Sequence, residues 1–262
     1  MNDILKEICN KKKEQLIKIK SMCSYKSLEK LILNKGNRGF KNLLTMAQIK
    51  QSNNIIAEIK KASPSAGLII NNYIPEKIAI LYEKSGIGSI SILTEKFFFK
   101  GEIDHLSLIH KKTNIPILRK DFIIDEYQIL ESKVYNADAI LLIVSILTNQ
   151  QIIDFIDLAN EKGLDCLLET HTEEDLERAI KIGYPIIGIN NRNLKNLSID
   201  INNTLKLIEQ IPSEFIIVGE SGIKTYEDIK SYNNVGIYNF LIGESILISD
   251  DIPIKIKELL NS

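Results

Sequence analysis

The chain has 262 residues, 44% of them hydrophobic, which suffices for one α/β barrel or for two smaller domains. Its 33 basic and 34 acidic residues leave a formal charge of −1, which argues against nucleic acid or an anionic membrane as partner. Because there is no apolar run of membrane-spanning length, no signal peptide, and three cysteines without disulfide or metal spacing, we expect a cytoplasmic protein with a small-molecule partner.

The first fifty residues precede any repeating unit. Helical periodicity covers Ile4 to Ile19 and again Ser27 to Leu33. The sequence therefore predicts that residues 1–50 form a helical extension packed on the remainder of a single domain. The lysine run 11–13 is interpreted as a solvated helix face, since lysine is abundant along the whole chain.

From Ile55 onward, short β-branched runs alternate with longer segments of helical period, as in repeated βα units around a parallel sheet. The predicted strands are Ile55–Ile59, Ser89–Leu93, Ile115–Arg119, Ala139–Val144, Asp165–Leu168, Ile186–Ile189, Phe215–Val218 and Asn239–Ile242. The helix signals between them are Pro75, Thr172 and Thr225 at starts and Gly86, Gly163 and Gly183 at ends. Eight such units close a barrel, so we predict a (β/α)8 TIM barrel with an N-terminal helical extension.

Polar residues stand at the carboxyl ends of several predicted strands. Glu58 and Lys60 are two apart in an extended segment, so their side chains point the same way. The other polar strand ends are at Lys120, Glu169, Asn190 and Ser221. Because an α/β barrel places its active site at the carboxyl ends of its strands, we predict that these five ends converge on one cavity.

The two lysines are candidate general acids, or stabilisers of a developing oxyanion. Glu58 beside Lys60 favours the charged form of that lysine, which can then donate a proton. The competing interpretations are an exposed loop lysine for Lys60 and an ion pair with Asp121 for Lys120.

Three further residues fit a reactive site. Glu169 follows an apolar run, so burial is expected to raise its pKa toward the range of a general base or acid, although a rim salt bridge is the alternative. Asn190 would orient a hydroxyl or a catalytic side chain, unless it only makes a turn. Arg192 would bind a carboxylate bidentately, unless it makes an ordinary surface ion pair. Phe97 to Phe99 would wall an aromatic pocket, though core packing is the commoner role.

A phosphate site is predicted after the last two strands. Barrels commonly bind phosphate there through backbone N–H groups, and Gly222 and Gly243 would allow close approach of the anion. Tight turns alone are the other interpretation of these glycines. The Glu244 carboxylate is expected to turn away from the anion. No metal and no nucleotide cofactor are expected, because the three histidines and the glycines show no such motif.

Five motifs together resemble one known family, indole-3-glycerol-phosphate synthase of the tryptophan pathway. They are Ala57-Glu58-Ile59-Lys60-Lys61-Ala62-Ser63-Pro64-Ser65, Leu93-Thr94-Glu95, Ile117-Leu118-Arg119-Lys120-Asp121-Phe122, Gly188-Ile189-Asn190-Asn191-Arg192 and Gly219-Glu220-Ser221-Gly222-Ile223. The resemblance spans nearly the whole chain. It implies a (β/α)8 barrel with N-terminal helices that converts 1-(2-carboxyphenylamino)-1-deoxyribulose 5-phosphate into indole-3-glycerol phosphate, releasing carbon dioxide and water without metal or cofactor.

The resemblance also implies residue roles. Lys120 would protonate the ribulose carbonyl, Glu169 would be the base and Lys60 the other donor, with Glu58 and Asn190 holding them in place. Which lysine acts at which step stays open. The implied substrate-binding residues are Ser63 and Arg192 for the anthranilate carboxylate, Glu220 and Ser221 for the sugar chain, and Gly222, Gly243 and the Glu244 N–H for phosphate.

Three other functions are kept as alternatives. Phosphoribosylanthranilate isomerase is also a phosphosugar barrel, but that family uses a cysteine and an aspartate where this chain has Glu58 and Lys60. A Schiff-base aldolase would use Lys60 or Lys120 as nucleophile. A non-catalytic barrel would keep only the phosphate site. A monomer is expected, and association with other enzymes of the pathway stays open.

Overall fold

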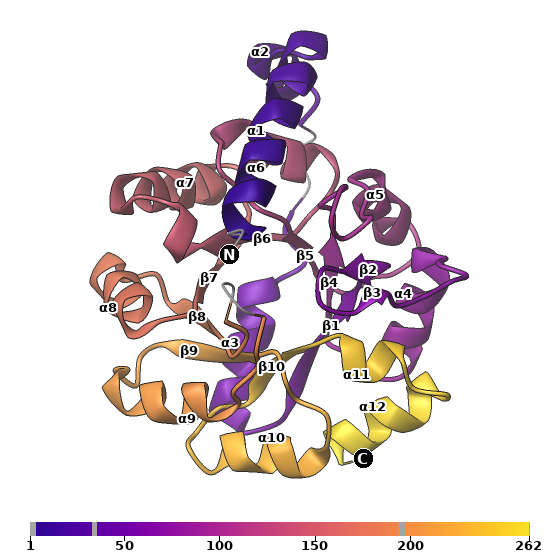
Figure 1. Ribbon diagram of the computed structural model, residues 1–262, viewed down its shortest axis with the longest axis vertical. Helices are drawn as coiled ribbons and strands as arrows, with labels where there is room; N and C mark the ends of the chain where they lie inside the picture. Colours follow the sequence, from indigo (N-terminus) through magenta and orange to yellow (C-terminus); the bar gives the residue numbers. More distant parts are fainter. Residues whose placement is uncertain (1–3, 33–35, 194–196, 262) are drawn as a thin grey trace.

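The computed structural model describes residues 4–32, 36–193 and 197–261. Within them, parallel strands close into a barrel in the order β1-β10-β9-β8-β7-β6-β5-β4 (Figure 1). The strands are β1 (Asn54–Ile59), β4 (Ser89–Leu93), β5 (Ile117–Lys120), β6 (Ala139–Ile143), β7 (Asp165–Thr170), β8 (Ile186–Asn190), β9 (Ile216–Glu220) and β10 (Asn239–Ile242). The predicted (β/α)8 barrel and each of its eight strands are confirmed, and the strand ends differ by at most two residues.

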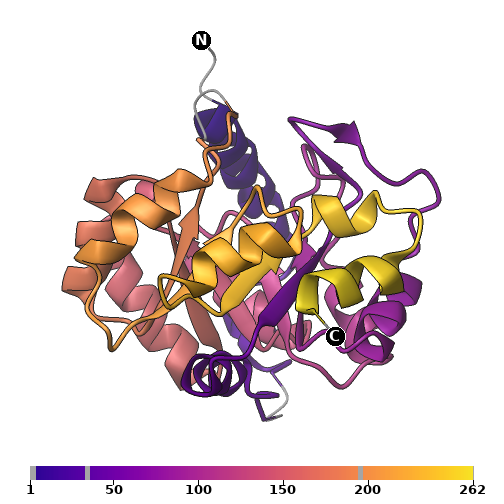
Figure 2. The same cartoon turned by 90° about the horizontal axis from the view of Figure 1, so that it is seen from below.

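Helices surround the barrel and connect its strands (Figures 1 and 2). They are α4 (Pro75–Lys84), α5 (Asp104–His110), α6 (Glu126–Val134), α7 (Asn149–Glu161), α8 (Glu173–Ile182), α9 (Asn202–Leu207), α10 (Tyr226–Asn233), α11 (Glu244–Leu247) and α12 (Ile252–Leu260), with 3-10 turns η1 (Val144–Ile146) and η2 (Ile208–Gln210). The predicted start signals are confirmed, since Thr172 and Thr225 cap α8 and α10 and Pro75 lies in the first turn of α4. Gly183 ends α8 in the left-handed conformation, as predicted.

The strands are apolar on both faces because one face lines the barrel and the other lies under the helices. In β6, for example, every residue is buried. Glu169 and Asn190 lie near the carboxyl ends of β7 and β8, where the core gives way to a cavity. The hydrophobic core therefore holds the carboxyl rim rigidly while the rim itself is free to carry charge.

The N-terminal extension has three helices, α1 (Ile4–Met22), α2 (Tyr25–Glu29) and α3 (Phe40–Lys50). The first is predicted correctly, while the second starts and ends earlier than expected, with Leu33 outside the described residues. The third was not predicted. Figures 1 and 2 show α1 beginning at the carboxyl rim and α3 lying under the opposite end of the barrel.

The interpretation of the lysine run in α1 as solvated is wrong at one position. Lys11 and Lys13 are exposed, but the Lys12 side chain is only 4% exposed. It follows Ile8 and precedes Leu16 on the buried face of α1, because residues four apart share one side of a helix. Because lysine is abundant along the chain, the sequence did not reveal that Lys12 is buried.

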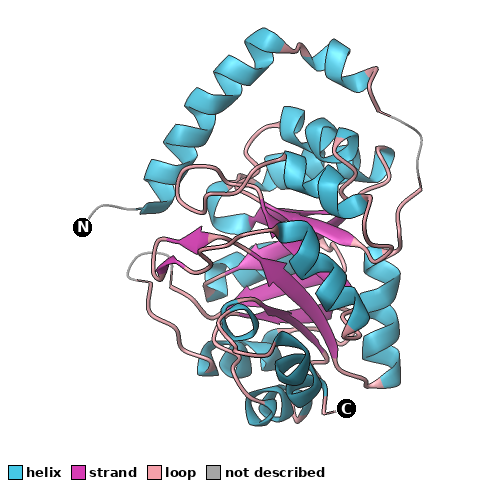
Figure 3. Ribbon diagram, turned by 90° about the vertical axis from the view of Figure 1, so that its right-hand side faces the viewer, coloured by secondary structure: helices cyan, strands magenta, loops and turns pink. Residues whose placement is uncertain are grey.

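A small hairpin follows β1 beside the mouth of the barrel (Figure 3). The antiparallel strands β2 (Ala62–Ser63) and β3 (Gly67–Leu68) form it, with Ser63 opposite Gly67. This pairing was not predicted from the sequence. Within the described residues, no helix combines the length and apolar character needed to cross a bilayer.

Candidate active site

A cavity of about 840 Å³, including its mouth, opens at the carboxyl ends of the strands. Its lining includes all five predicted strand ends, namely Glu58 with Lys60, Lys120, Glu169, Asn190 and Ser221. The predicted convergence on one cavity is therefore confirmed. The chemistry of the cavity follows from how these charges are paired.

Glu58 and Lys60 form a close ion pair at the end of β1. Lys60 Nζ lies 2.6 Å from Glu58 Oε1, and the side chains are 12% and 6% exposed. An exposed loop lysine is thus the wrong interpretation of Lys60. Burial raises the pKa of Glu58, but Lys60 and Lys120 outweigh it and the pKa is lowered. Glu58 is therefore ionised and holds the neighbouring ammonium in place.

Lys120 lies between the carboxylates of two other strands, Glu169 of β7 and Glu220 of β9. Its Nζ is 2.8 Å from Glu169 Oε2 and 3.3 Å from Glu220 Oε2, so the alternative of a pair with Asp121 is wrong. Burial lowers the pKa of Lys120, but the carboxylates of Glu169, Glu220 and Glu58 outweigh it and the pKa is raised. The ammonium is therefore charged and carries a proton into the cavity.

Glu169 forms an ion pair with Lys120, in line with the predicted alternative of a rim salt bridge, and it also contacts His171, which the sequence prediction did not include. Burial does raise its pKa, but Lys120 and His171 outweigh burial, so the pKa is lowered well below its ordinary value and the predicted direction is wrong. His171 Nε2 lies 3.2 Å from Glu169 Oε1. Glu169 is therefore ionised, and an ionised carboxylate can accept a proton. Glu169 and His171 are two residues apart, as are Glu58 and Lys60, so strand alternation could have predicted that the Glu169 and His171 side chains lie together.

Glu220 is the carboxyl group with incomplete pairing. Its side chain is 1% exposed, and within the described residues Oε1 has no hydrogen-bond partner. Burial raises its pKa, Lys120 lowers it and Glu169 raises it again, so the pKa lies well above the ordinary value. A Cβ at position 188 would collide with Glu220 Oε1, and Gly188 therefore makes the room that this carboxyl group occupies.

Arg192 joins the hairpin to the rim of β8. Its Nη1 donates to Ser65 Oγ at 3.0 Å, and its backbone N–H donates to Asn190 Oδ1 at 3.0 Å. Ser63, Asn190 and Arg192 all line the cavity. A guanidinium and a serine hydroxyl beside one another match the requirement for binding a carboxylate.

The predicted phosphate residues line an adjoining cavity, with Lys60 and Lys120 at its boundary. Gly222 has φ 89, and a Cβ there would lie 2.7 Å from the side chains of Ile199 and Ile201. At Gly243 a Cβ would lie 2.7 Å from Glu58 Oε1. Close packing therefore requires both glycines, whatever they bind.

Ser221 and Glu244 also line this second cavity. Ser221 has φ 63, which is uncommon outside glycine and is typical of functional turns. The Glu244 carboxylate is 43% exposed and lies 3.9 Å from Arg192 Nη2 along the rim. That it turns away from a bound anion stays a prediction.

Apolar side chains form the remaining wall of the first cavity. The first turns of α1 contribute Ile4, Leu5 and Ile8, which the sequence did not predict. Of the phenylalanine run, Phe99 lines the cavity, whereas Phe97 is 52% exposed. The other apolar members are Pro64, Leu93, Phe122, Leu141, Ile143 and Leu197. An aromatic ring would fit such a wall.

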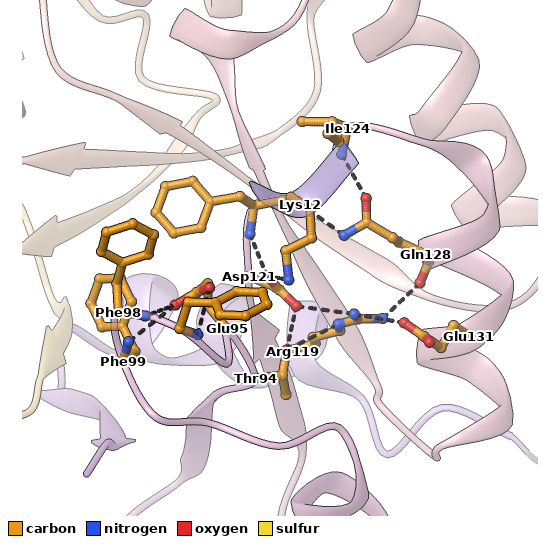
Figure 4. Close-up of polar contacts among 12 residues, drawn as sticks. Lys12, Thr94, Glu95, Phe98, Phe99, Arg119, Asp121, Ile124, Gln128 and Glu131 are labelled. Atoms are coloured by element: carbon orange, nitrogen blue, oxygen red, sulfur yellow. Dashed lines mark hydrogen bonds and ion pairs between the residues drawn. The ribbon is translucent and has the colours of Figure 1, made fainter. Parts of the chain in front are cut away.

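Glu95 shapes the loop that carries this phenylalanine run. Its carboxylate accepts hydrogen bonds from three successive backbone N–H groups, at 2.9, 2.7 and 3.0 Å, as Figure 4 shows for two of them. Sequence reasoning gave Glu95 no role. Across the described residues, no group of three or more His, Cys, Asp or Glu side chains is arranged to hold a metal ion.

Solved structures with similar folds include two phosphosugar enzymes. The 3-hexulose-6-phosphate synthase from Salmonella typhimurium gives a TM-score of 0.62 at 12% identity, covering 79% of this chain and 97% of the other. The N-acetylmannosamine-6-phosphate 2-epimerase from Clostridium perfringens gives 0.56 at 17% identity, covering 73% and 86%. These matches support the barrel fold alone.

Sequence relatives identify the family. The indole-3-glycerol phosphate synthase from Caldanaerobacter subterraneus subsp. tengcongensis is 49% identical over 253 residues, covering 96% of each chain. The protein of the same name from Legionella pneumophila strain Paris is 44% identical over 261 residues, covering 99% of each. The family model for indole-3-glycerol phosphate synthase matches residues 5–259. The chain therefore belongs to the indole-3-glycerol phosphate synthase family.

Proposed function

We propose that the protein is a carboxy-lyase that closes the indole ring of 1-(2-carboxyphenylamino)-1-deoxyribulose 5-phosphate by lysine and glutamate acid–base catalysis. The observation that carries the mechanism is the Lys120 ammonium held between Glu169 and Glu220 inside the cavity. Membership of the family and the names of its relatives support the substrate.

Ring closure is the first step. The substrate's ring carbon that bears the carboxylate attacks the ketone carbon, while Lys120 donates a proton to the ketone oxygen. This forms the new C–C bond and a hydroxyl group. Because the Lys120 pKa is raised by its carboxylate neighbours, its charge also stabilises the oxyanion as it develops.

Loss of carbon dioxide and water completes the reaction. The C–CO₂ bond breaks and its electron pair returns to the six-membered ring. The new hydroxyl then leaves as water, with a proton from a lysine, for which we propose Lys60. Glu169 accepts the proton released when the indole double bond forms. Its lowered pKa keeps it ionised and ready to accept.

Binding of the substrate is divided between the two cavities. Phosphate would lie against the backbone of Gly222, Gly243 and Glu244 in the second cavity. The anthranilate ring would lie on the apolar wall, with Ser63 and Arg192 on its carboxylate. Glu220 and Ser221, which both line the second cavity, would contact the sugar hydroxyls.

The direct test is incubation with the carboxyphenylamino substrate while indole fluorescence is recorded. We expect emission to grow with time and with enzyme concentration. Tight binding without emission would favour the non-catalytic phosphate-binding barrel. Trapping of a substrate adduct by borohydride would favour an aldolase. We further propose a cytoplasmic monomer, which size-exclusion chromatography with light scattering checks for its oligomeric state.

A further inference from the structure

A buried ionic network lies directly behind the candidate active site (Figure 4). Asp121 Oδ1 lies 2.8 Å from Lys12 Nζ, while Oδ2 accepts from Thr94 Oγ1 at 2.7 Å and Arg119 Nη2 at 3.0 Å. Arg119 also pairs with Glu131 at 2.8 Å. None of these four charged side chains is more than 9% exposed.

Lys12 is the member of this network that comes from α1. Its neighbours on the same helix face are Ile8 one turn earlier and Leu16 one turn later, both buried. An apolar residue at position 12 would continue this stripe without the cost of removing an ammonium from water. A buried ion pair adds little stability over such a replacement, but it fixes the register of packed elements because only one alignment pairs the charges.

Register matters here because both partners of the ion pair lie next to the cavity. One and two turns before Lys12, the side chains of Ile8, Leu5 and Ile4 form part of the cavity wall. On the other side, Asp121 directly follows Lys120 in the sequence and itself borders the cavity. A shift of α1 along the barrel would therefore move the apolar wall and the segment that carries the proton donor together.

We propose that Lys12 is a positioning residue, which fixes the register of α1 through Asp121 and so sets the apolar wall of the active-site cavity and the place of Lys120. The inference rests on the proposed function for its catalytic consequence. The claim that Lys12 fixes the register of α1 does not depend on the proposed function. Lys12 itself touches no reacting atom, so its effect on turnover is indirect.

The first test is the kinetics of Lys12→Met, which keeps an unbranched side chain of nearly the same length and removes its charge. We expect kcat/KM to fall about 10- to 100-fold, with a higher KM from the displaced wall and a lower kcat from the displaced ammonium. Lys12→Arg keeps the charge and is expected to restore most of the activity. Wild-type kcat and KM in Lys12→Met would overturn the proposal.

Two further variants separate positioning from stability. Lys20→Met removes the exposed 2.7 Å ion pair between α1 and Asp125 and should leave both kinetic constants unchanged. The double variant Lys12→Met/Asp121→Asn leaves no unpaired charge, so its melting temperature should stay within about 2–4 °C of wild type. Its kcat/KM should be as low as that of Lys12→Met. If the double variant regained wild-type kinetics, Lys12 would have no positioning role.

Hydrogen exchange of the backbone amides in residues 5–11 tests the register without any substrate. We expect faster exchange in Lys12→Met than in Lys20→Met, because only the first loosens the start of α1. Equal exchange in both variants would overturn the inference. If the wild-type protein forms no indole, the proposed function fails, and this exchange comparison still decides the role of Lys12.

Discussion

Two ionic clusters are built on residues 119–121, at the carboxyl end of β5, and differ in how completely they are paired. Arg119 and Asp121 belong to the outer network, in which two cations meet two carboxylates. Lys120, between them in sequence, belongs to the inner cluster, where it meets Glu169 and Glu220. The same residue types therefore serve two environments one residue apart, because successive side chains of a strand point to opposite faces.

The difference lies in the surplus carboxyl group. The inner cluster has two ammonium groups, those of Lys60 and Lys120, and three carboxyl groups, those of Glu58, Glu169 and Glu220. Burial is the main cause of the raised pKa of Glu220; Lys120 lowers this pKa, and the neighbouring Glu169 carboxylate raises it again. A balanced buried network holds elements in place, whereas an unbalanced one has protons and lone pairs left for a substrate.

Loss of the inner cation should have the largest effect on turnover. In Lys120→Met we expect kcat to fall about 10³- to 10⁴-fold, because both the proton donor and the charge on the oxyanion are removed. Steady-state indole formation measures it, and circular dichroism checks that the fold is kept. A near-normal kcat would remove Lys120 from its proposed role.

Loss of the outer cation should act on stability instead. Arg119→Met leaves Glu131 without its ion-pair partner, so we expect the free energy of unfolding to fall by about 3–5 kcal/mol. Urea denaturation measures the change. A variant as stable as wild type but inactive would mean that the outer network also takes part in the chemistry, and the contrast between the clusters would fail.

Removal of the proposed base, Glu169, should have the next largest effect, and this effect is on turnover. Glu169→Gln keeps the shape but cannot accept a proton, so we expect kcat to fall about 10²- to 10³-fold with the fold kept. Glu174→Gln, at an exposed position in the first turn of α8, is the matched control and should have wild-type kinetics. Near-normal turnover in Glu169→Gln would assign the base elsewhere.

The smallest effects should appear in the pH dependence of stability. The pKa of Glu220 in the folded protein is raised above the value of about 4.3 that it has in the unfolded chain. The carboxyl group therefore stabilises the fold below about pH 4.3, and this contribution is lost as the pH rises through the folded pKa. Glutamine does not titrate, and the stability of Glu220→Gln relative to wild type should therefore increase over that range. Urea titrations from pH 4 to pH 8 measure it.

Asp121 should show the opposite slope. Burial raises its pKa, but Lys12 and Arg119 outweigh it, and the folded pKa lies below the unfolded value of about 3.9. Its stabilising contribution is present above that value and is lost as pH falls through the folded pKa. The advantage of wild type over Asp121→Asn should therefore shrink in acid. Parallel slopes for the two variants would mean that the clusters are not electrostatically distinct.

The barrel and much of its rim could be predicted because both follow from local periodicity. Strand alternation alone placed Glu58 beside Lys60, and the count of βα units gave the closure. Partners across the barrel could not be found in this way. Lys120 reaches Glu169 and Glu220 from other strands, so the direction of the Glu169 pKa was misjudged from burial alone.

The elements outside the βα repeat were the least predictable. The α3 helix carries the helical spacing Phe40, Leu44 and Ala47, which the prediction overlooked, whereas the short β2–β3 hairpin has no repeating pattern to mark it. The buried Lys12 did leave one signal, a lysine four residues from Ile8 and four from Leu16 in an apolar stripe. The charged run around it concealed that spacing.

The two partners of the Lys12–Asp121 ion pair are synthesised at different times. The α1 helix leaves the ribosome first, but Asp121 follows about a hundred residues later, roughly 5–20 s at ordinary rates of synthesis. During that interval the Lys12 ammonium lacks Asp121, and Leu16 lacks Tyr127 and Leu130 of α6, against which it packs. A chaperone that shelters nascent apolar segments would meet this helix before the barrel exists to receive it.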